Sequence, residues 1–238
     1  MIPKIIHYCW LSGDPYPEKI QHCIDSWKKV LPEYEIILWD KQRFNLEDNL
    51  WCKQAFENKK YAFAADYIRM YALYHYGGIY LDSDVEVFKK FDDLLDLPYF
   101  IGREGVGNRV EVAAFGADKG TEWVGDCMRY YEGRSFIKED GTFDTTVMPD
   151  VVYNILSANY RINLINKKDE FVFEKNVFNE FPNDWFCANV HLSPSDIKPT
   201  YIISNNSYCV HHFANSWVKI NKFKVWIKHI LVKLRIIR

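Results

Sequence analysis

Two acidic residues, Asp82 and Asp84, stand one residue apart where the apolar run of "GGIYLDSDVEV" (77–87) ends. As a turn or cap, their side chains would bind nearby backbone N–H groups. As an acid/base pair, they would move protons. As a cation site, they would converge on one divalent ion, because alternate side chains of a strand point the same way. The tripeptide alone favours the turn, so its neighbours must decide.

A charged pair precedes these acids in the mostly apolar segment "YAFAADYIRMYALYHYGG" (61–78). Asp66 and Arg69 are three residues apart and share one face if the segment is helical. A buried structural ion pair is one interpretation. The other is ligand binding, since Arg can grip phosphate or hydroxyl oxygens and Asp can accept from sugar hydroxyls. The Gly-Gly turn that delivers this helix into the acidic strand end favours ligand binding.

The elements that position these residues alternate between strands and helices. Strands are expected in 4–10 and 35–40, a helix in 18–31 stopped by Pro32, two helical pieces in 46–76, and a third strand in 79–82. This order predicts an α/β domain with a largely parallel sheet. Such sheets bind ligands at the carboxyl ends of their strands, where Trp10, Asp40 and Asp82 fall. Further on, strands are expected in 99–102, 110–117 and 208–213, and helices in 121–133 and 150–160.

Composition limits the class of protein. The chain has 238 residues, 48% of them hydrophobic and 17% aromatic, which predicts a folded globular domain. A net charge of -2 argues against nucleic acid as a partner. The six cysteines are scattered without a CxxC pair and are expected to be buried free thiols. No secretory leader and no apolar run of about 18 residues is found, so a cytoplasmic location is expected.

The C-terminal segment 218–238 is predicted to be a separate basic amphipathic helix after a catalytic domain of residues 1–217. It carries seven Lys or Arg residues and no acid. Its apolar side chains recur every three or four residues, at Ile220, Phe223, Ile227, Ile230, Leu234 and Ile237. The helix could pack on its own domain. The long acid-free stretch favours an anionic membrane surface, which would place the protein on the inner face of the cell membrane.

The order of "IPKIIHYCW", "EIILWD", "AFAADYIRMYALYHYGGIYLDSDVEV" and "VHHFANSW" resembles the DXD-containing glycosyltransferase family 32. That family includes yeast Golgi mannosyltransferases, vertebrate α-galactosyltransferases and bacterial capsule enzymes. The resemblance implies a GT-A fold, in which a Rossmann-like nucleotide-binding half and an acceptor half share one continuous sheet. It also implies a nucleotide-sugar donor, a Mn²⁺ or Mg²⁺ ion, and transfer with retention of the anomeric configuration.

The resemblance also assigns roles to residues around the acidic motif. Asp82 and Asp84 match the DXD motif, with Asp82 near the ribose and the metal and Asp84 on the metal. Asp66 and Arg69 match the pair that holds the donor sugar. Asp66, Arg69 and Asp84 are therefore the predicted catalytic residues. The resemblance identifies no protein nucleophile.

Residues near both ends of the chain complete the implied site. Trp10 matches an aromatic that stacks near the base, although core packing is as good an interpretation. His7 lies in the same strand and is also predicted to contact the donor. In "HHFANSW", the family pattern selects His211 as a third metal ligand, followed by Ser216 and Trp217 at the donor. His212 is expected to face the other way.

The predicted function is transfer of a hexose, galactose or glucose, from a UDP-linked donor to a saccharide acceptor. The acceptor could be lipid-linked, and the expected setting is bacterial capsule or surface polysaccharide synthesis. A GDP-mannose-dependent mannosyltransferase is the alternative within the family. A metal-dependent phosphoryl hydrolase and a non-catalytic binding module are the alternatives outside it.

Overall fold

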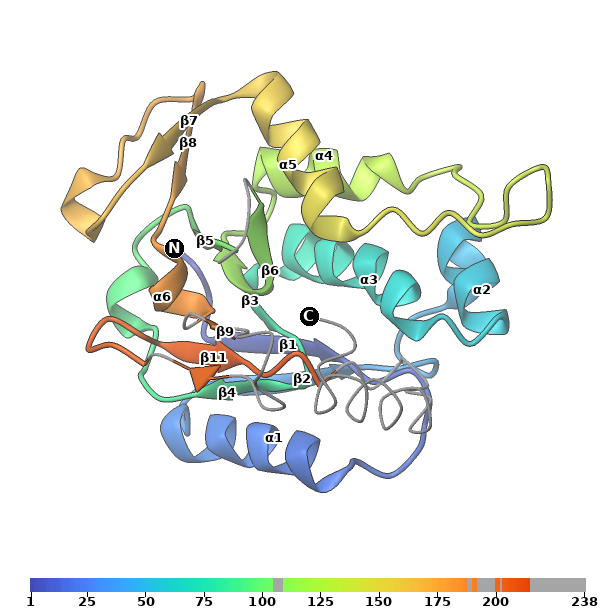
Figure 1. Ribbon diagram of the computed structural model, residues 1–238, viewed down its shortest axis with the longest axis horizontal. Helices are drawn as coiled ribbons and strands as arrows, with labels where there is room; N and C mark the ends of the chain where they lie inside the picture. Colours follow the sequence, from blue (N-terminus) through green and yellow to red (C-terminus); the bar gives the residue numbers. More distant parts are fainter. Residues whose placement is uncertain (105–108, 188–189, 192–199, 202, 215–238) are drawn as a thin grey trace, which may run out of the picture.

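The structure is a computed structural model that describes residues 1–104, 109–187, 190–191, 200–201 and 203–214. Its centre is a five-stranded sheet with the strand order β2-β1-β3-β6-β5. Figure 1 shows α1 on one side of this sheet and α3 with α4 on the other. The predicted α/β class is confirmed. Ser216, Trp217 and the predicted amphipathic helix of 218–238 lie outside the described residues.

The first half of the chain builds the parallel part of the sheet, where β1 pairs in parallel with both β2 and β3. The predicted helix before Pro32 is confirmed, and so are the two helical pieces of 46–76. The amide N–H of Cys52 donates to the Asn49 side chain, which caps the first piece (2.9 Å). In chain order these elements are β1 (Ile5–Cys9), α1 (Glu18–Val30), β2 (Glu35–Trp39), η1 (Leu46–Asp48), α2 (Leu50–Glu57), α3 (Tyr61–Tyr76) and β3 (Gly78–Leu81).

Gly77 and Gly78 connect α3 to β3 and are needed for two reasons. Both have positive φ angles, +67° and +116°, which other L-residues rarely adopt. A Cβ at Gly78 would lie 2.7 Å from the carbonyl oxygen of Ile5, and one at Gly77 would lie 2.8 Å from the amide nitrogen of Lys119. The glycine pair therefore lets β3 pack directly beside β1 at the end of the helix.

The prediction of a largely parallel sheet holds for four of its five strands, which point the same way. Only β6 is reversed, because it runs antiparallel to both β3 and β5. The chain between β5 and β6 is only residues 104–109, too short for the crossover that a parallel pair requires. The remaining elements are β4 (Val85–Val87), η2 (Asp92–Leu94), β5 (Tyr99–Arg103), β6 (Val110–Ala117), α4 (Glu122–Tyr130), α5 (Met148–Asn159), β7 (Arg161–Leu164), η3 (Lys168–Glu170), β8 (Val177–Glu180), α6 (Asn183–Phe186), β9 (Val190–His191), β10 (Thr200–Tyr201) and β11 (Cys209–His211).

A small ribbon of β4 and β11 brings the end of the described chain back to the acidic motif. The two strands are antiparallel, with His211 opposite Val85. Helix α1 holds the ribbon, because the indole N–H of Trp27 donates to the carbonyl of Val85 (2.7 Å). The side chains of β11 are thereby placed next to residues more than a hundred positions earlier.

The six cysteines are buried and unpaired, as predicted. Within the described ranges, no helix combines the length and apolarity needed to cross a membrane.

Candidate active site

Asp82 and Asp84 lie in a turn between β3 and β4 rather than on one strand, so the strand alternation expected for them is wrong. The amide of Val85 donates to the carbonyl of Asp82 (2.9 Å) and closes this turn. The carboxylates nevertheless converge. One ligand atom from each of Asp82, Asp84 and His211 lies within 4.8 Å of the others. The turn therefore brings together the side chains that a cation site would need.

Asp84 is held as an anion. Its Oδ2 accepts from the amide of Ala214 (2.7 Å), and its Oδ1 lies 3.4 Å from Nε2 of His211. Burial acts to raise its pKa, but His211 and the Ala214 amide outweigh that effect and lower the pKa to about 2. A carboxylate that stays ionised at every physiological pH suits a metal ligand.

His211 lies between two carboxylates. Its Nε2 faces Asp84, and its Nδ1 lies 3.4 Å from Oε1 of Glu111, while the ring of Phe213 covers it at 3.9 Å between centroids. Burial acts to lower its pKa, but Glu111 and Asp84 outweigh burial and raise the pKa well above the usual histidine value. A cation bound at Nε2 would therefore have to displace a proton. His212 points elsewhere, with its Nε2 at 2.9 Å from Oε2 of Glu86.

Arg69 joins the helix pair to the acidic turn. Its Nη2 donates to Oδ1 of Asp66 (3.1 Å), and its Nη1 donates to the carbonyl of Val112 (2.8 Å) and lies 3.4 Å from Oδ1 of Asp82. The guanidinium also lies over the ring of Tyr80, 4.7 Å from its centroid. Because Asp66 and Asp82 flank one guanidinium, the two motifs found in the sequence form a single cluster.

The pKa values of the other two carboxyls, Asp66 and Asp82, are shifted in the opposite direction from that of Asp84. Burial raises the pKa of Asp66 to about 7, although Arg69 opposes the shift. Burial likewise raises the pKa of Asp82, against Arg69 and His211. The hydroxyl of Tyr80 donates to Oδ1 of Asp82 (2.9 Å). A cation bound beside Asp82 would favour its ionised form.

The two predicted site residues near the first strand, Trp10 and His7, differ in how far they are buried. Trp10 directly follows β1 and is partly exposed, with its indole N–H donating to the carbonyl of Asp14 (2.7 Å). His7 is fully buried, with Nε2 bonded to the carbonyl of Gly77 (2.9 Å) and Nδ1 accepting from Trp39 (3.0 Å). Burial lowers the pKa of His7 to about 4. Both ring nitrogens of His7 are engaged in the core. No ring nitrogen is therefore left to contact a nucleotide-sugar donor.

Glu111 is the site residue that the sequence analysis missed. It is 3% exposed and enters the cluster from β6, which the sequence predicted only as a strand. The available signal was one acid within "VEVAAFGA", because a charged side chain is rarely buried unless it is paired.

The ligand set fits a hard divalent cation. Two carboxylates and one imidazole suit Mn²⁺ or Mg²⁺ better than a soft metal, and open positions would remain for phosphate oxygens. Asp82, Asp84 and His211 are the residues that would hold it.

Comparison with known proteins agrees with this geometry. Residues 17–101 match the family of the glycosyltransferase sugar-binding region containing DXD motif. This part of the chain is therefore similar to a DXD-type glycosyltransferase region. Together with the continuous sheet, the match agrees with the predicted GT-A fold.

Named relatives include mannosyl phosphorylinositol ceramide synthase SUR1 of Saccharomyces cerevisiae, which is 38% identical over an alignment of 120 residues that covers 46% of this chain and 30% of that protein. Inositol phosphoceramide mannosyltransferase 3 of Schizosaccharomyces pombe is 36% identical over 116 residues, 46% of this chain and 32% of that protein. The chain spans about a third of the length of these relatives.

Among solved structures, the PaToxG glycosyltransferase is 20% identical, with a TM-score of 0.48 over 66% of this chain and 69% of that one. The galactosyltransferase LgtC is 11% identical, with a TM-score of 0.45 over 92% of this chain and 91% of that one.

Proposed function

We propose that this protein is a metal-dependent, retaining glycosyltransferase that moves a hexose from a nucleotide sugar to a saccharide acceptor. The observation that carries the proposal is the convergence of Asp82, Asp84 and His211 beside the Asp66–Arg69 pair. The cluster lies past the carboxyl end of β3, where open α/β sheets bind nucleotides. The match of residues 17–101 to the DXD region supports the same activity.

Each group in the cluster has a task in this chemistry. The bound cation would supply charge neutralisation for the departing diphosphate. Asp82, Asp84 and His211 would hold it. Both terminal nitrogens of Arg69 contact protein acceptors, so Arg69 would keep Asp66 and Asp82 in position while its charge favours the diphosphate. Asp66 would accept from a hydroxyl of the donor sugar. The proposal names no protein nucleophile.

The proposal has two versions, which differ in the identity of the donor sugar. Galactose or glucose on UDP is the prediction from sequence, whereas the names of the relatives favour mannose, and hence a GDP-mannose donor. Trp10, at the end of β1 and partly exposed, is the proposed stacking surface for the base. Ser216 and Trp217 stay predicted donor contacts.

The acceptor is proposed to be a lipid-linked saccharide of a bacterial surface polysaccharide. Two observations support a lipid-linked acceptor: the basic, apolar segment 218–238, and relatives whose names give inositol phosphoceramide, a lipid, as their substrate. The enzyme would then work in the cytoplasm at the inner face of the membrane, bound through that segment to anionic lipid.

A thermal-shift screen tests the donor step. UDP-galactose, UDP-glucose and GDP-mannose are each added with and without Mn²⁺, and the cognate donor should raise the melting temperature only when Mn²⁺ is present. At 100 times its dissociation constant, a ligand stabilises the native state by about 2.7 kcal/mol. If no nucleotide sugar shifts the melting temperature with Mn²⁺ or Mg²⁺, the proposal fails.

A second measurement separates the competing reactions. The cognate donor is incubated with the protein, with and without a saccharide acceptor, and the products are resolved. A transferase forms the new glycoside when acceptor is present. A phosphoryl hydrolase releases phosphate or nucleotide at the same rate with or without acceptor, and a binding module leaves the donor intact.

A further inference from the structure

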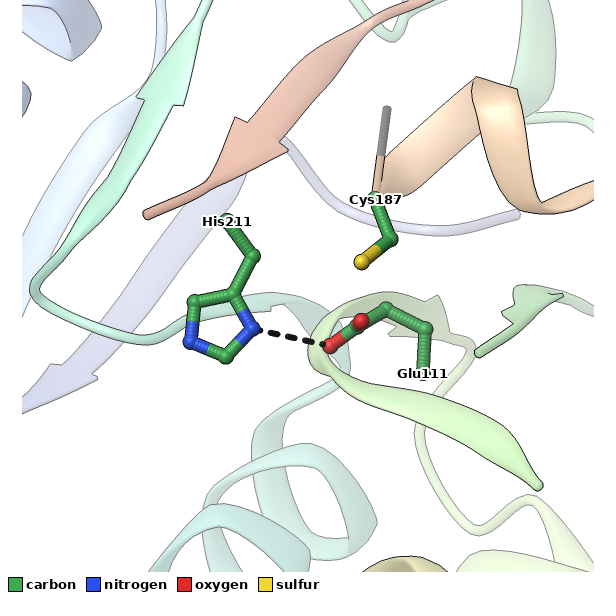
Figure 2. Close-up of side chains that lie close together, drawn as sticks. All are labelled: Glu111, Cys187 and His211. Atoms are coloured by element: carbon green, nitrogen blue, oxygen red, sulfur yellow. Dashed lines mark ion pairs between the residues drawn. The ribbon is translucent and has the colours of Figure 1, made fainter. Parts of the chain in front are cut away.

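Glu111 contacts His211 on the side opposite the acidic turn. Figure 2 shows the ion pair between Oε1 of Glu111 and Nδ1 of His211, which are 3.4 Å apart, with the Cys187 side chain pointing toward the same space. The other ring nitrogen, Nε2, lies 3.4 Å from Oδ1 of Asp84. One imidazole therefore has a proposed metal ligand at Nε2 and a buried carboxylate at Nδ1.

Glu111 is itself held rigidly. Its Oε1 accepts from the amide of Ala113 (2.8 Å), and Sγ of Cys187 lies within 4.8 Å of its carboxylate. These contacts come from β6 and from the residue that follows α6. The side chain is 3% exposed, so water cannot replace His211 as its charged partner. A fixed, desolvated carboxylate can impose an orientation on the ring that it faces.

We propose that Glu111 is the positioning residue that fixes the tautomer and orientation of His211. A neutral imidazole carries one N–H, and the nitrogen without it supplies the lone pair. If Nδ1–H donates to Glu111, the lone pair of Nε2 points toward Asp82 and Asp84. Metal-binding histidines almost always donate their second N–H to a carboxylate, a carbonyl or water. At 3.4 Å, Nδ1 of His211 faces Oε1 of Glu111 as a buried nitrogen that makes no hydrogen bond to another group among the described residues.

The inference rests on the proposed metal site. A second interpretation of these residues, as a separate metal site, can be tested in the same experiment. Glu111, Cys187 and His211 also offer ligand atoms within 4.8 Å of one another, so they could hold a soft cation themselves. Cys187 argues against this, because burial raises the pKa of its thiol and so disfavours the thiolate that such a metal requires. Cys187→Ser keeps a hydrogen-bond donor at this position and removes the sulfur, which separates the two interpretations.

The test measures Mn²⁺ binding without a donor sugar, from the electron paramagnetic resonance signal of free Mn²⁺. Glu111→Gln, and Glu111→Asp with its shorter reach, should each weaken Mn²⁺ binding about 10- to 100-fold. Glu180→Gln is the matched control, since Glu180 is another buried carboxyl, on β8 and outside the cluster, and should leave Mn²⁺ binding unchanged. Cys187→Ser should also leave it unchanged.

The tautomer of His211 can also be measured in the unaltered protein, so the test does not depend on whether the variants fold. In the unaltered protein with Mg²⁺, the ¹⁵N spectrum of His211 should show the tautomer protonated at Nδ1. Protonation at Nε2 instead would overturn the inference. So would Mn²⁺ affinity that is unchanged in Glu111→Gln, or a loss in Cys187→Ser as large as that in Glu111→Gln. If the unaltered protein binds no Mn²⁺ or Mg²⁺, the metal assignment fails together with the inference, whereas unchanged binding in Glu111→Gln alone removes only the role of Glu111.

Discussion

Replacing Arg69 by Lys keeps a positive charge in the cluster but removes the planar group that makes three contacts. In the native protein, Nη2 bonds to Asp66, while Nη1 bonds to the carbonyl of Val112 and lies beside Asp82. A lysine presents all its donors from one atom, so it cannot reach acceptors on different sides at once. We expect the introduced lysine to pair with one carboxylate and to leave the Val112 carbonyl without a donor.

The size of the effect follows from these contacts. A buried acceptor that loses its partner costs about 1–3 kcal/mol, and a lost hydrogen bond to a charged group costs about 1.5–3 kcal/mol. The free energy of unfolding should therefore fall by about 3 kcal/mol. The transfer rate should fall about 100-fold, as when one preorganised donor to a developing charge is removed.

Urea unfolding and initial rates per folded molecule measure the two effects separately. Arg103→Lys is the control, because Arg103 donates to the backbone carbonyls of Phe181 (3.3 Å) and Ile165 (3.2 Å), away from the acidic turn. It should lose about 1 kcal/mol of stability and keep its transfer rate. If Arg69→Lys turns over as fast as Arg103→Lys, the donor role of Arg69 is refuted and the pair is structural.

Three further changes test other parts of the molecule. Asp84→Asn should abolish Mn²⁺-dependent transfer while the protein stays folded, and full activity in this variant would exclude Asp84 as a metal ligand. Burial raises the pKa of Glu180 to about 7 from 4.5, so the unfolded state releases its proton first and stability falls as the pH rises from about 4.5 to 7. Glu180→Gln should remove that loss and add up to about 3 kcal/mol in urea unfolding at pH 8 but little at pH 4; equal gains at both would contradict the assignment. Removal of residues from Lys222 onward should abolish co-sedimentation with anionic vesicles at low salt and spare transfer to a soluble acceptor analogue, and equal sedimentation of both forms would exclude membrane binding.

Local sequence was sufficient for the elements of the first half. Helix α1 ends where Pro32 requires it to end, and α3 ends at the glycine pair. These predictions succeed because helix periodicity, caps and turn residues act over a few neighbouring positions. The same locality identified Asp66 with Arg69 and Asp82 with Asp84, since each pair lies within three residues. The roles of these residues came from the family resemblance and stay predictions until they are tested.

Only the tertiary structure decided which of these pieces meet. The Ala214 amide and Asp84 are 130 positions apart in the chain, and β11 joins them only because it pairs with β4. The same ribbon puts His211 beside Glu111, a residue that an apolar strand pattern conceals. In the opposite sense, His7 looked available for chemistry, yet the pairing of β1 between β2 and β3 buries it. Sequence spacing reports which side chains share a local element, whereas a site built from separate elements depends on strand pairing and packing between distant segments, which no local pattern records.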